Sequence, residues 1–323
     1  MPVLTVRHVT TYSYRQPVAF GEHRMMFRPR EGHDQRLLEE RLTITPAPAD
    51  VRWLHDVFGN SVALARFSGR ASELRFESVV RLDHAPLHAL DFRLDEHAQT
   101  YPFSYSVDDL PDLSRSIERQ CPDPDRQVER WAREFLRKDG GPTGTVDLLS
   151  AMTHAIKRTF AYMARHENGI QEPARTLRIR SGTCRDFAVL MIEAVRSLGL
   201  AARFVSGYLY SPGRDGEAGS HVGGGSTHAW VRVYLPGAGW VEFDPTNGIV
   251  GNRDLIRVAV ARDPRQAVPL AGTYVGFPSD AAGMRVEVSV TAAEPRSVAA
   301  AALATAGAAG EGEASAAASS GRP

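Results

Sequence analysis

The sequence contains very little cysteine and no excess of charge of either sign. Cys121 and Cys184 are its only cysteines in 323 residues. Two cysteines are more typical of free thiols in a cytoplasmic protein than of a disulfide framework. Lysine plus arginine and aspartate plus glutamate both number 38. The balance gives no electrostatic reason to expect nucleic acid or an anionic membrane as a partner.

Long apolar runs and paired metal ligands are also missing. No window approaches the ~18 apolar residues needed to cross a bilayer. Residues 1–14 alternate between polar and apolar instead of forming the apolar core of a signal peptide. His8, His23, His33 and His55 are scattered, without the close spacing of metal ligands. We therefore expect a cytoplasmic protein with no membrane partner, no metal and no cofactor.

The first 85 residues have the pattern of β-strands. Alternating residues at 4–9, and further apolar runs at 42–45, 62–67 and 74–82, are separated by turn signals such as Phe58-Gly59-Asn60. Short strands at this spacing, with no helix between them, predict a small antiparallel β domain over residues 1–85. Repeated prolines over residues 86–123 indicate a connector.

The pattern then changes to helices followed by strands. Apolar residues recur at helical spacing around 128–136, 148–160 and 184–198, and strands are expected near 202–210, 229–235 and 240–244. This order predicts an α+β domain over residues 124–291, with a last strand near 284–290. Residues 292–323 are rich in Ala, Gly and Ser, which predicts a disordered tail.

Cys184 lies at the start of a predicted helix. Thr183 and Asp186 have the spacing of a capping box, and Gly199 provides a stop after the apolar stripe. The dipole and free N–H groups of a helix N-terminus favour an anion, and the thiolate is the reactive form of cysteine. The spacing therefore makes Cys184 a candidate nucleophile, although a buried structural cysteine is the simpler explanation for an isolated cysteine.

A hairpin downstream carries the candidate partners of this cysteine. His228 begins one predicted strand and Asp244 ends the next, after the turn at 236–239. A simple four-residue loop would put the two side chains on opposite faces, so a catalytic pair requires a loop of odd length or a bulge. Taken alone, His228 is more simply a core or surface histidine, and Asp244 can serve only to start a turn.

Three motifs together resemble those of bacterial transglutaminase-like proteins with an N-terminal β region. They are Gly182–Ala188, Thr227–Val231 and Phe243–Asn247, and the N-terminal segments His8–Tyr14, Arg28–Arg30 and Phe58–Asn60 are also similar to that family. The resemblance implies a papain-like fold with Cys184 as nucleophile, His228 as general base and acid, and Asp244 as orienting residue. Ser181 stands where the family commonly has a second glycine before the cysteine.

Other residues near these motifs have weaker assignments. Tyr162 is a candidate for the oxyanion hole and Trp230 for a side chain that shields the site, with ordinary packing as the alternative for each. Residues 211–226 are glycine-rich and are expected to form a loop or lid beside the site.

These observations predict a cysteine-dependent acyl-transfer enzyme. Its substrate would be a peptide or protein amide, attacked through a thioester intermediate that water or an amine resolves. The alternative is a protein-binding or scaffold module on the same fold with an idle triad.

Overall fold

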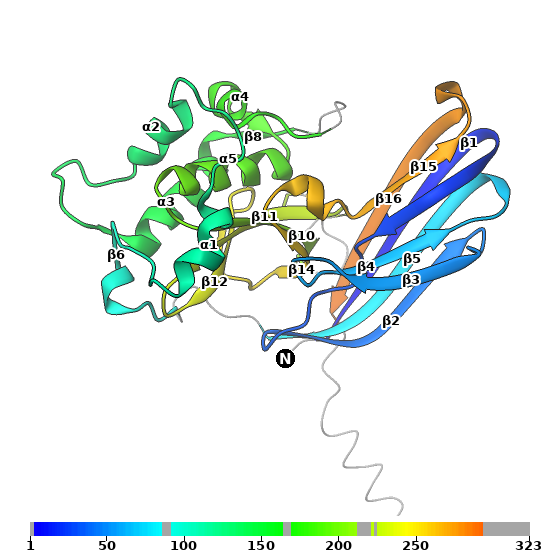
Figure 1. The fold of residues 1–323 in the computed structure, drawn as a ribbon, viewed down its shortest axis with the longest axis horizontal. Helices are drawn as coiled ribbons and strands as arrows, with labels where there is room; N and C mark the ends of the chain where they lie inside the picture. Colours follow the sequence, from blue (N-terminus) through cyan, green and yellow to red (C-terminus); the bar gives the residue numbers. More distant parts are fainter. Residues whose placement is uncertain (1–2, 86–91, 164–168, 212–220, 223–224, 293–323) are drawn as a thin grey trace, which may run out of the picture.

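The computed structural model describes residues 3–85, 92–163, 169–211, 221–222 and 225–292. Its strands form a large sheet of seven strands and a smaller one of five, and the helices gather around the smaller sheet (Figure 1). Most of the expected lid at 211–226 lies outside the described residues. The same holds for the expected tail beyond Ala292.

The large sheet is antiparallel and is built around one long strand. Its strands are β1 (Val3–Met25), β2 (Gln35–Thr45), β3 (Asp50–His55), β4 (Ser61–Arg66), β5 (Arg70–His84), β15 (Leu270–Val275) and β16 (Ala281–Ala292). Their order is β2-β5-β1-β4-β3, with β15 and β16 also paired to β1. The first half of β1 pairs with β5 and β16, and its second half pairs with β4 and β15.

Successive side chains along a strand point to opposite faces, and the alternation of apolar and polar residues explains which face of this sheet is buried. Leu4 and Val6 on β1, with Val80 and Leu82 on β5, are almost fully buried. They belong to the same hydrophobic cluster as the helices of the other half. The two halves of the chain therefore share one hydrophobic cluster, and the N-terminal sheet has a second cluster of its own around Phe20 and Phe76.

The last strand of the chain corrects the expected domain boundary. The strand expected at 284–290 lies within β16, but it pairs with β1 and not with the sheet of the α+β domain (Figure 1). Residues 270–292 therefore belong to the N-terminal sheet, because strand partners depend on which distant edge is open. The range expected to be only a connector also contains helix α1 (Asp109–Ile117), whose Leu113 is buried.

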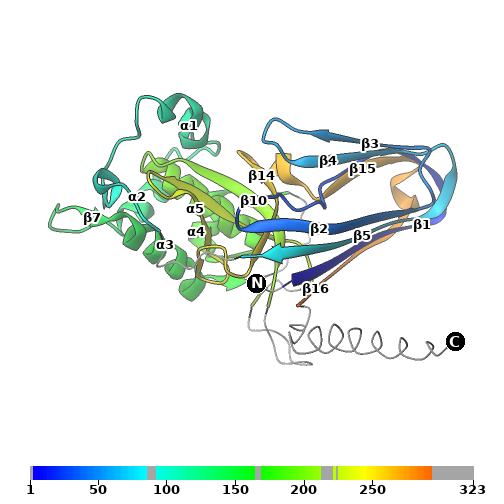
Figure 2. The same cartoon turned by 90° about the horizontal axis from the view of Figure 1, so that it is seen from below.

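The smaller sheet is covered by helices, and this half has the expected α+β architecture (Figure 2). In spatial order its strands are β13 (Ile249–Val250), β12 (Gly239–Asp244), β11 (His228–Leu235), β10 (Ala202–Leu209) and β14 (Leu255–Ala261). The other helices are α2 (Gln127–Arg133), α3 (Thr145–Thr159), α4 (Pro173–Ile179) and α5 (Cys184–Ser197). Two short strand pairs complete it, β6 (Thr100–Tyr101) with β7 (Thr143–Gly144) and β8 (Ala161–Tyr162) with β9 (Ser181–Gly182). Within the described ranges, no helix has the length and apolar content that a membrane crossing requires.

Side-chain amides from the N-terminal half cover the edge strand β14. Asn60 donates to the Val260 carbonyl at 2.8 Å and accepts from the Val260 N–H at 2.9 Å. Gln35 makes the same pair of bonds with the backbone of Arg257, at 2.8 and 3.0 Å. An open strand edge exposes backbone groups that need partners. The two amides satisfy part of that edge and attach one sheet to the other.

Candidate active site

The first turn of α5 is held in place by its cap. Thr183 donates its backbone N–H to Asp186 Oδ2 at 2.8 Å, and its Oγ1 accepts from the Asp186 N–H, which completes the predicted capping box. The other carboxylate oxygen of Asp186 accepts from Gln171 N at 2.8 Å. Cys184 is the first helical residue, with 7% of its surface exposed. The helix therefore presents a nearly buried thiol at its positive end.

The hairpin has the odd loop that a His–Asp pair requires. Leu235 pairs with Gly239 and Val231 with Phe243, so three residues form the turn. In this register His228 and Asp244 lie on the same face, and His228 Nε2 is 2.8 Å from Asp244 Oδ2. Both side chains are completely buried. The structure thus brings together the histidine and the aspartate selected from the sequence.

Asp244 is held by more than the histidine. Thr246 donates its backbone N–H to Oδ1 at 2.9 Å, and the Asn247 side-chain amide donates to Oδ2 at 2.9 Å. Asn247 also bonds both backbone groups of Val222, which ties the segment before β11 to the end of β12. Asn247 belongs to one of the three sequence motifs, but no role was predicted for it.

The electrostatics of the site favour the charged forms of both His228 and Asp244. Burial raises the pKa of Asp244, but His228 and the donors around the carboxylate outweigh this, and the pKa is lowered overall. Burial would lower the pKa of His228, but the Asp244 carboxylate and the Cys184 sulfur raise it well above its usual value. Among the described residues, His228 Nδ1 has no hydrogen-bond partner. The ring therefore bonds Asp244 through Nε2, and Nδ1 is the nitrogen available to Cys184.

Tyr162 also lies beside the sulfur. Its strand β8 runs parallel to β9, with Tyr162 paired to Gly182 two residues before Cys184. Burial and the neighbouring Cys184 raise the pKa of Tyr162 to about 12, so its hydroxyl stays protonated and can donate. Tyr162 is 38% exposed, so it is accessible to solvent.

Trp230 lies beneath the histidine, away from solvent. Its ring stacks on His228 with centroids 5.9 Å apart and 27° between the planes, and it is fully buried. Gly207 on β10 pairs with His228 and leaves the space for that ring, because a Cβ at Gly207 would lie 2.6 Å from Trp230 Cη2. A glycine inside a strand is a sequence signal of such a close approach, and it could have pointed to this contact.

The second cysteine has different surroundings. Burial and the Glu193 carboxylate raise the pKa of the Cys121 thiol to about 11. Glu193 accepts hydrogen bonds from the backbone N–H groups of Gln120 and Cys121. Cys121 therefore remains a protonated thiol at neutral pH.

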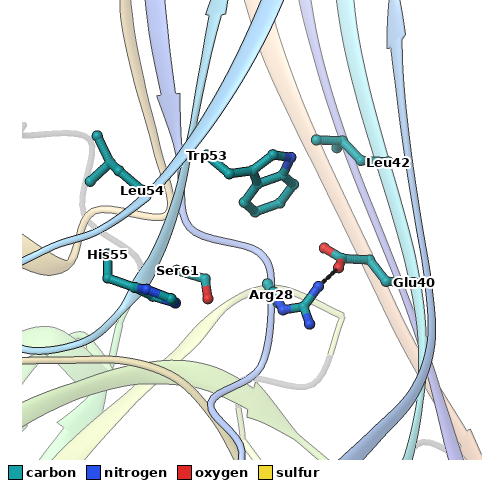
Figure 3. Close-up of a pocket in the computed structure, with 7 residues that line it drawn as sticks. All are labelled: Arg28, Glu40, Leu42, Trp53, Leu54, His55 and Ser61. Carbon is teal, nitrogen blue, oxygen red and sulfur yellow. Dashed lines mark hydrogen bonds and ion pairs between the residues drawn. The ribbon is translucent and has the colours of Figure 1, made fainter.

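A separate cavity of about 520 Å³ lies in the N-terminal half. Figure 3 shows the Trp53 ring facing Leu42 and the Arg28–Glu40 ion pair, with His55 and Ser61 nearby. None of its lining residues belongs to the Cys184 site. Within the described ranges, no three His, Cys, Asp or Glu side chains are grouped as metal ligands would be.

Comparison with known proteins agrees with the class that this fold and site define. Residues 129–245 match the transglutaminase-like superfamily, and residues 4–83 match the bacterial transglutaminase-like N-terminal region. The uncharacterized protein Rv2569c of Mycobacterium tuberculosis is 30% identical over 83% of this chain and 86% of its own. The chain therefore belongs to the bacterial transglutaminase-like family, as the sequence motifs predicted.

Two further similarities concern the fold and a short stretch of sequence. A solved structure titled "Putative Cysteine Protease from Cytophaga hutchinsonii" covers 92% of both chains with a TM-score of 0.66 at 18% identity, which confirms the fold. The protein-glutamine gamma-glutamyltransferase of Pseudomonas aeruginosa is 37% identical over 76 residues, which is 23% of this chain and 11% of that protein.

Proposed function

We propose that this protein transfers acyl groups from an amide or peptide carbonyl, with Cys184 as nucleophile. The observation that carries the proposal is the buried His228–Asp244 pair, 2.8 Å apart, beside a thiol at a helix N-terminus. This is the arrangement of nucleophile, base and orienting carboxylate that activates a thiol. The buried Asp244 carboxylate stabilises His228 as the imidazolium, which is the partner that favours a reactive thiolate.

The reaction has two half-reactions. The Cys184 thiolate attacks the carbonyl carbon, and the tetrahedral oxyanion accepts hydrogen bonds from the Cys184 N–H and the Tyr162 hydroxyl. His228 gives its proton to the departing amine, the C–N bond breaks and a thioester remains. Neutral His228 then takes a proton from water or from a second amine, which attacks the thioester and releases an acid or a new amide.

The test is the rate of Cys184 alkylation by iodoacetamide as a function of pH. We expect wild-type Cys184 to react readily below pH 7, because the imidazolium favours the thiolate. His228→Ala should shift the profile to higher pH, and Asp244→Asn should shift it less, because the imidazole remains. Cys121 is the internal control, since its pKa of about 11 keeps it unreactive in this range.

A negative result would be equally clear. If Cys184 titrates like a free thiol, near a pKa of ~8.5, and neither substitution moves the profile, the triad is idle. The scaffold function would then be favoured. If Cys184 reacts below pH 7 and the two substitutions shift its profile, peptides and glutamine amides should then be screened for release of ammonia or amine.

A further inference from the structure

A cavity of about 500 Å³ lies between the N-terminal sheet and the catalytic half. One wall comes from β1 and β16, where Tyr12 pairs with Met284 and Val286 is nearby. The other wall includes Ile170, Arg185 and Thr227. Arg185 directly follows Cys184 and Thr227 directly precedes His228, so the cavity lies beside the backbone of the reactive pair, although neither Cys184 nor His228 lines it.

β16 is connected to the site as well as to the cavity. Val288 donates its backbone N–H to the Gly225 carbonyl at 3.0 Å, three residues before His228. The N-terminal sheet therefore holds the approach to β11 and also forms part of the cavity wall.

Arg185 places a positive charge in the wall of the cavity. Its guanidinium lies 5.7 Å from the centroid of the Phe204 ring, and among the described residues no carboxylate forms an ion pair with it. Burial lowers its pKa, with the Cys184 thiolate and the Asp186 carboxylate acting against this. The Asp186 oxygens already accept hydrogen bonds from Thr183 and Gln171. A mostly buried cation without a paired anion is costly, and an anionic ligand would remove that cost.

Arg265 lines the same cavity but is neutralised. Its guanidinium bonds both carboxylate oxygens of Asp263, at 2.9 and 2.7 Å. Arg185 is therefore the cation that can receive a ligand, and Arg265, which is paired and whose side chain is 83% exposed, provides a comparison. Ile170, Met284 and Val286 add apolar surface to the lining, and His8 and Thr10 add polar groups.

We propose that this cavity binds a substrate carboxylate at Arg185, next to the attacked carbonyl, and an apolar side chain against the wall formed by β1 and β16. The substrate class is thus a peptide or amide with an acidic group and an apolar side chain adjoining the reacting carbonyl. This inference rests on the proposed acyl transfer, and it makes the N-terminal sheet a determinant of specificity.

The experiment compares three alkylating probes on the full-length protein. Bromoacetyl-leucine has both a carboxylate and an apolar side chain, bromoacetyl-leucinamide lacks the charge, and bromoacetyl-glycine lacks the side chain. We expect Cys184 to react with bromoacetyl-leucine about tenfold faster than with either of the others. The amide probe loses one charge-assisted hydrogen bond, and the glycine probe loses the burial of an apolar side chain. Arg185→Gln should abolish the preference for charge, and Arg185→Lys should retain part of it. Arg265→Gln should leave it unchanged.

The apolar wall is tested separately by Val286→Asp. A carboxylate at this position should slow bromoacetyl-leucine specifically, and this variant tests the cavity even if Arg185→Gln does not fold. The inference is overturned if Arg185→Gln slows all three probes by the same factor, because Arg185 would then act only on the thiolate. It is also overturned if wild-type protein reacts equally with all three. Failure of the acyl-transfer proposal would appear elsewhere, in the iodoacetamide profile, since the probe ratio does not depend on absolute reactivity.

Discussion

At the scale of single residues, the state of His228 depends on how Asp244 is held. The carboxylate accepts from His228 Nε2, Thr246 N and the Asn247 amide, all within 2.9 Å. These donors lower the pKa of Asp244 against the effect of burial. A carboxylate kept ionised and in one orientation can fix the tautomer of the imidazole and stabilise its charge. Asn247 is therefore a positioning residue.

We predict that Asn247→Ala weakens, but does not abolish, the hydrogen bonding that holds the Asp244 carboxylate against His228. The acidic limb of the Cys184 alkylation profile should move to higher pH by about one unit, the scale of one hydrogen bond to a charged group. The shift should be smaller than that of His228→Ala. Thr246→Ala is the matched control, because its hydroxyl has no partner among the described residues while its backbone N–H makes the bond. Equal profiles for Asn247→Ala and Thr246→Ala would contradict the positioning role.

At the scale of elements, the site depends on how closely β10, β11 and β14 approach. Gly207 on β10 pairs with His228 on one side and Arg257 on the other, at a shift of register between β10 and β14. A Cβ at this position would lie 2.1 Å from the Ile256 carbonyl oxygen and 2.6 Å from Trp230 Cη2. Backbone on one side and a buried ring on the other leave no space for relaxation.

We predict that Gly207→Ala both destabilises the protein and disturbs the site. Overpacking of this kind costs about 1–3 kcal/mol of unfolding free energy. The displaced Trp230 ring should also shift the Cys184 alkylation profile, because that ring stacks on His228. Gly69→Ala is the control, since a Cβ there meets nothing within 4 Å. Thermal unfolding and alkylation of both variants check the prediction, and a Gly207→Ala protein as stable as wild type would refute it.

At the scale of the whole molecule, buried ions join the two halves. The Arg257 guanidinium on β14 bonds both oxygens of Asp34, at 2.6 and 2.7 Å, and also Glu242 at 2.9 Å. Burial raises the pKa of Asp34, but the hydrogen bonds and charge of Arg257 outweigh it and lower the pKa from 3.8 to about 2. Breaking such a pair leaves a buried charge without its partner.

We predict that Asp34→Asn lowers the free energy of unfolding at pH 7 by about 2 kcal/mol, the equivalent of the shift in pKa. Because the folded pKa is depressed, the contribution is present above the unfolded value near 4 and is lost as pH falls toward 2. The difference in the free energy of unfolding between wild type and Asp34→Asn should therefore shrink below pH 4. Urea unfolding at several pH values measures it. Asp50→Asn, which breaks an exposed pair with Arg66, should have little effect at any pH. A difference that does not change with pH would rule out the linkage.

The boundary between the halves could not be read from the sequence. β16 has the alternation of a strand, but nothing in residues 281–292 specifies that its partner is β1, more than 250 positions earlier. Expecting it in the catalytic domain was wrong for that reason. Helix α1 was missed because prolines dominate its surroundings and its apolar face is short.

What the sequence determined by itself is the chemistry that depends on local order. The cap and apolar stripe of α5 follow from side chains three or four residues apart, so Thr183, Asp186 and the position of Cys184 could be predicted. The family followed from three short motifs. The tertiary structure alone decided the register of the β11–β12 hairpin, the space that Gly207 leaves for Trp230, and the cavity between Arg185 and β16. These depend on atoms brought together from distant parts of the chain, and no local pattern encodes their spacing.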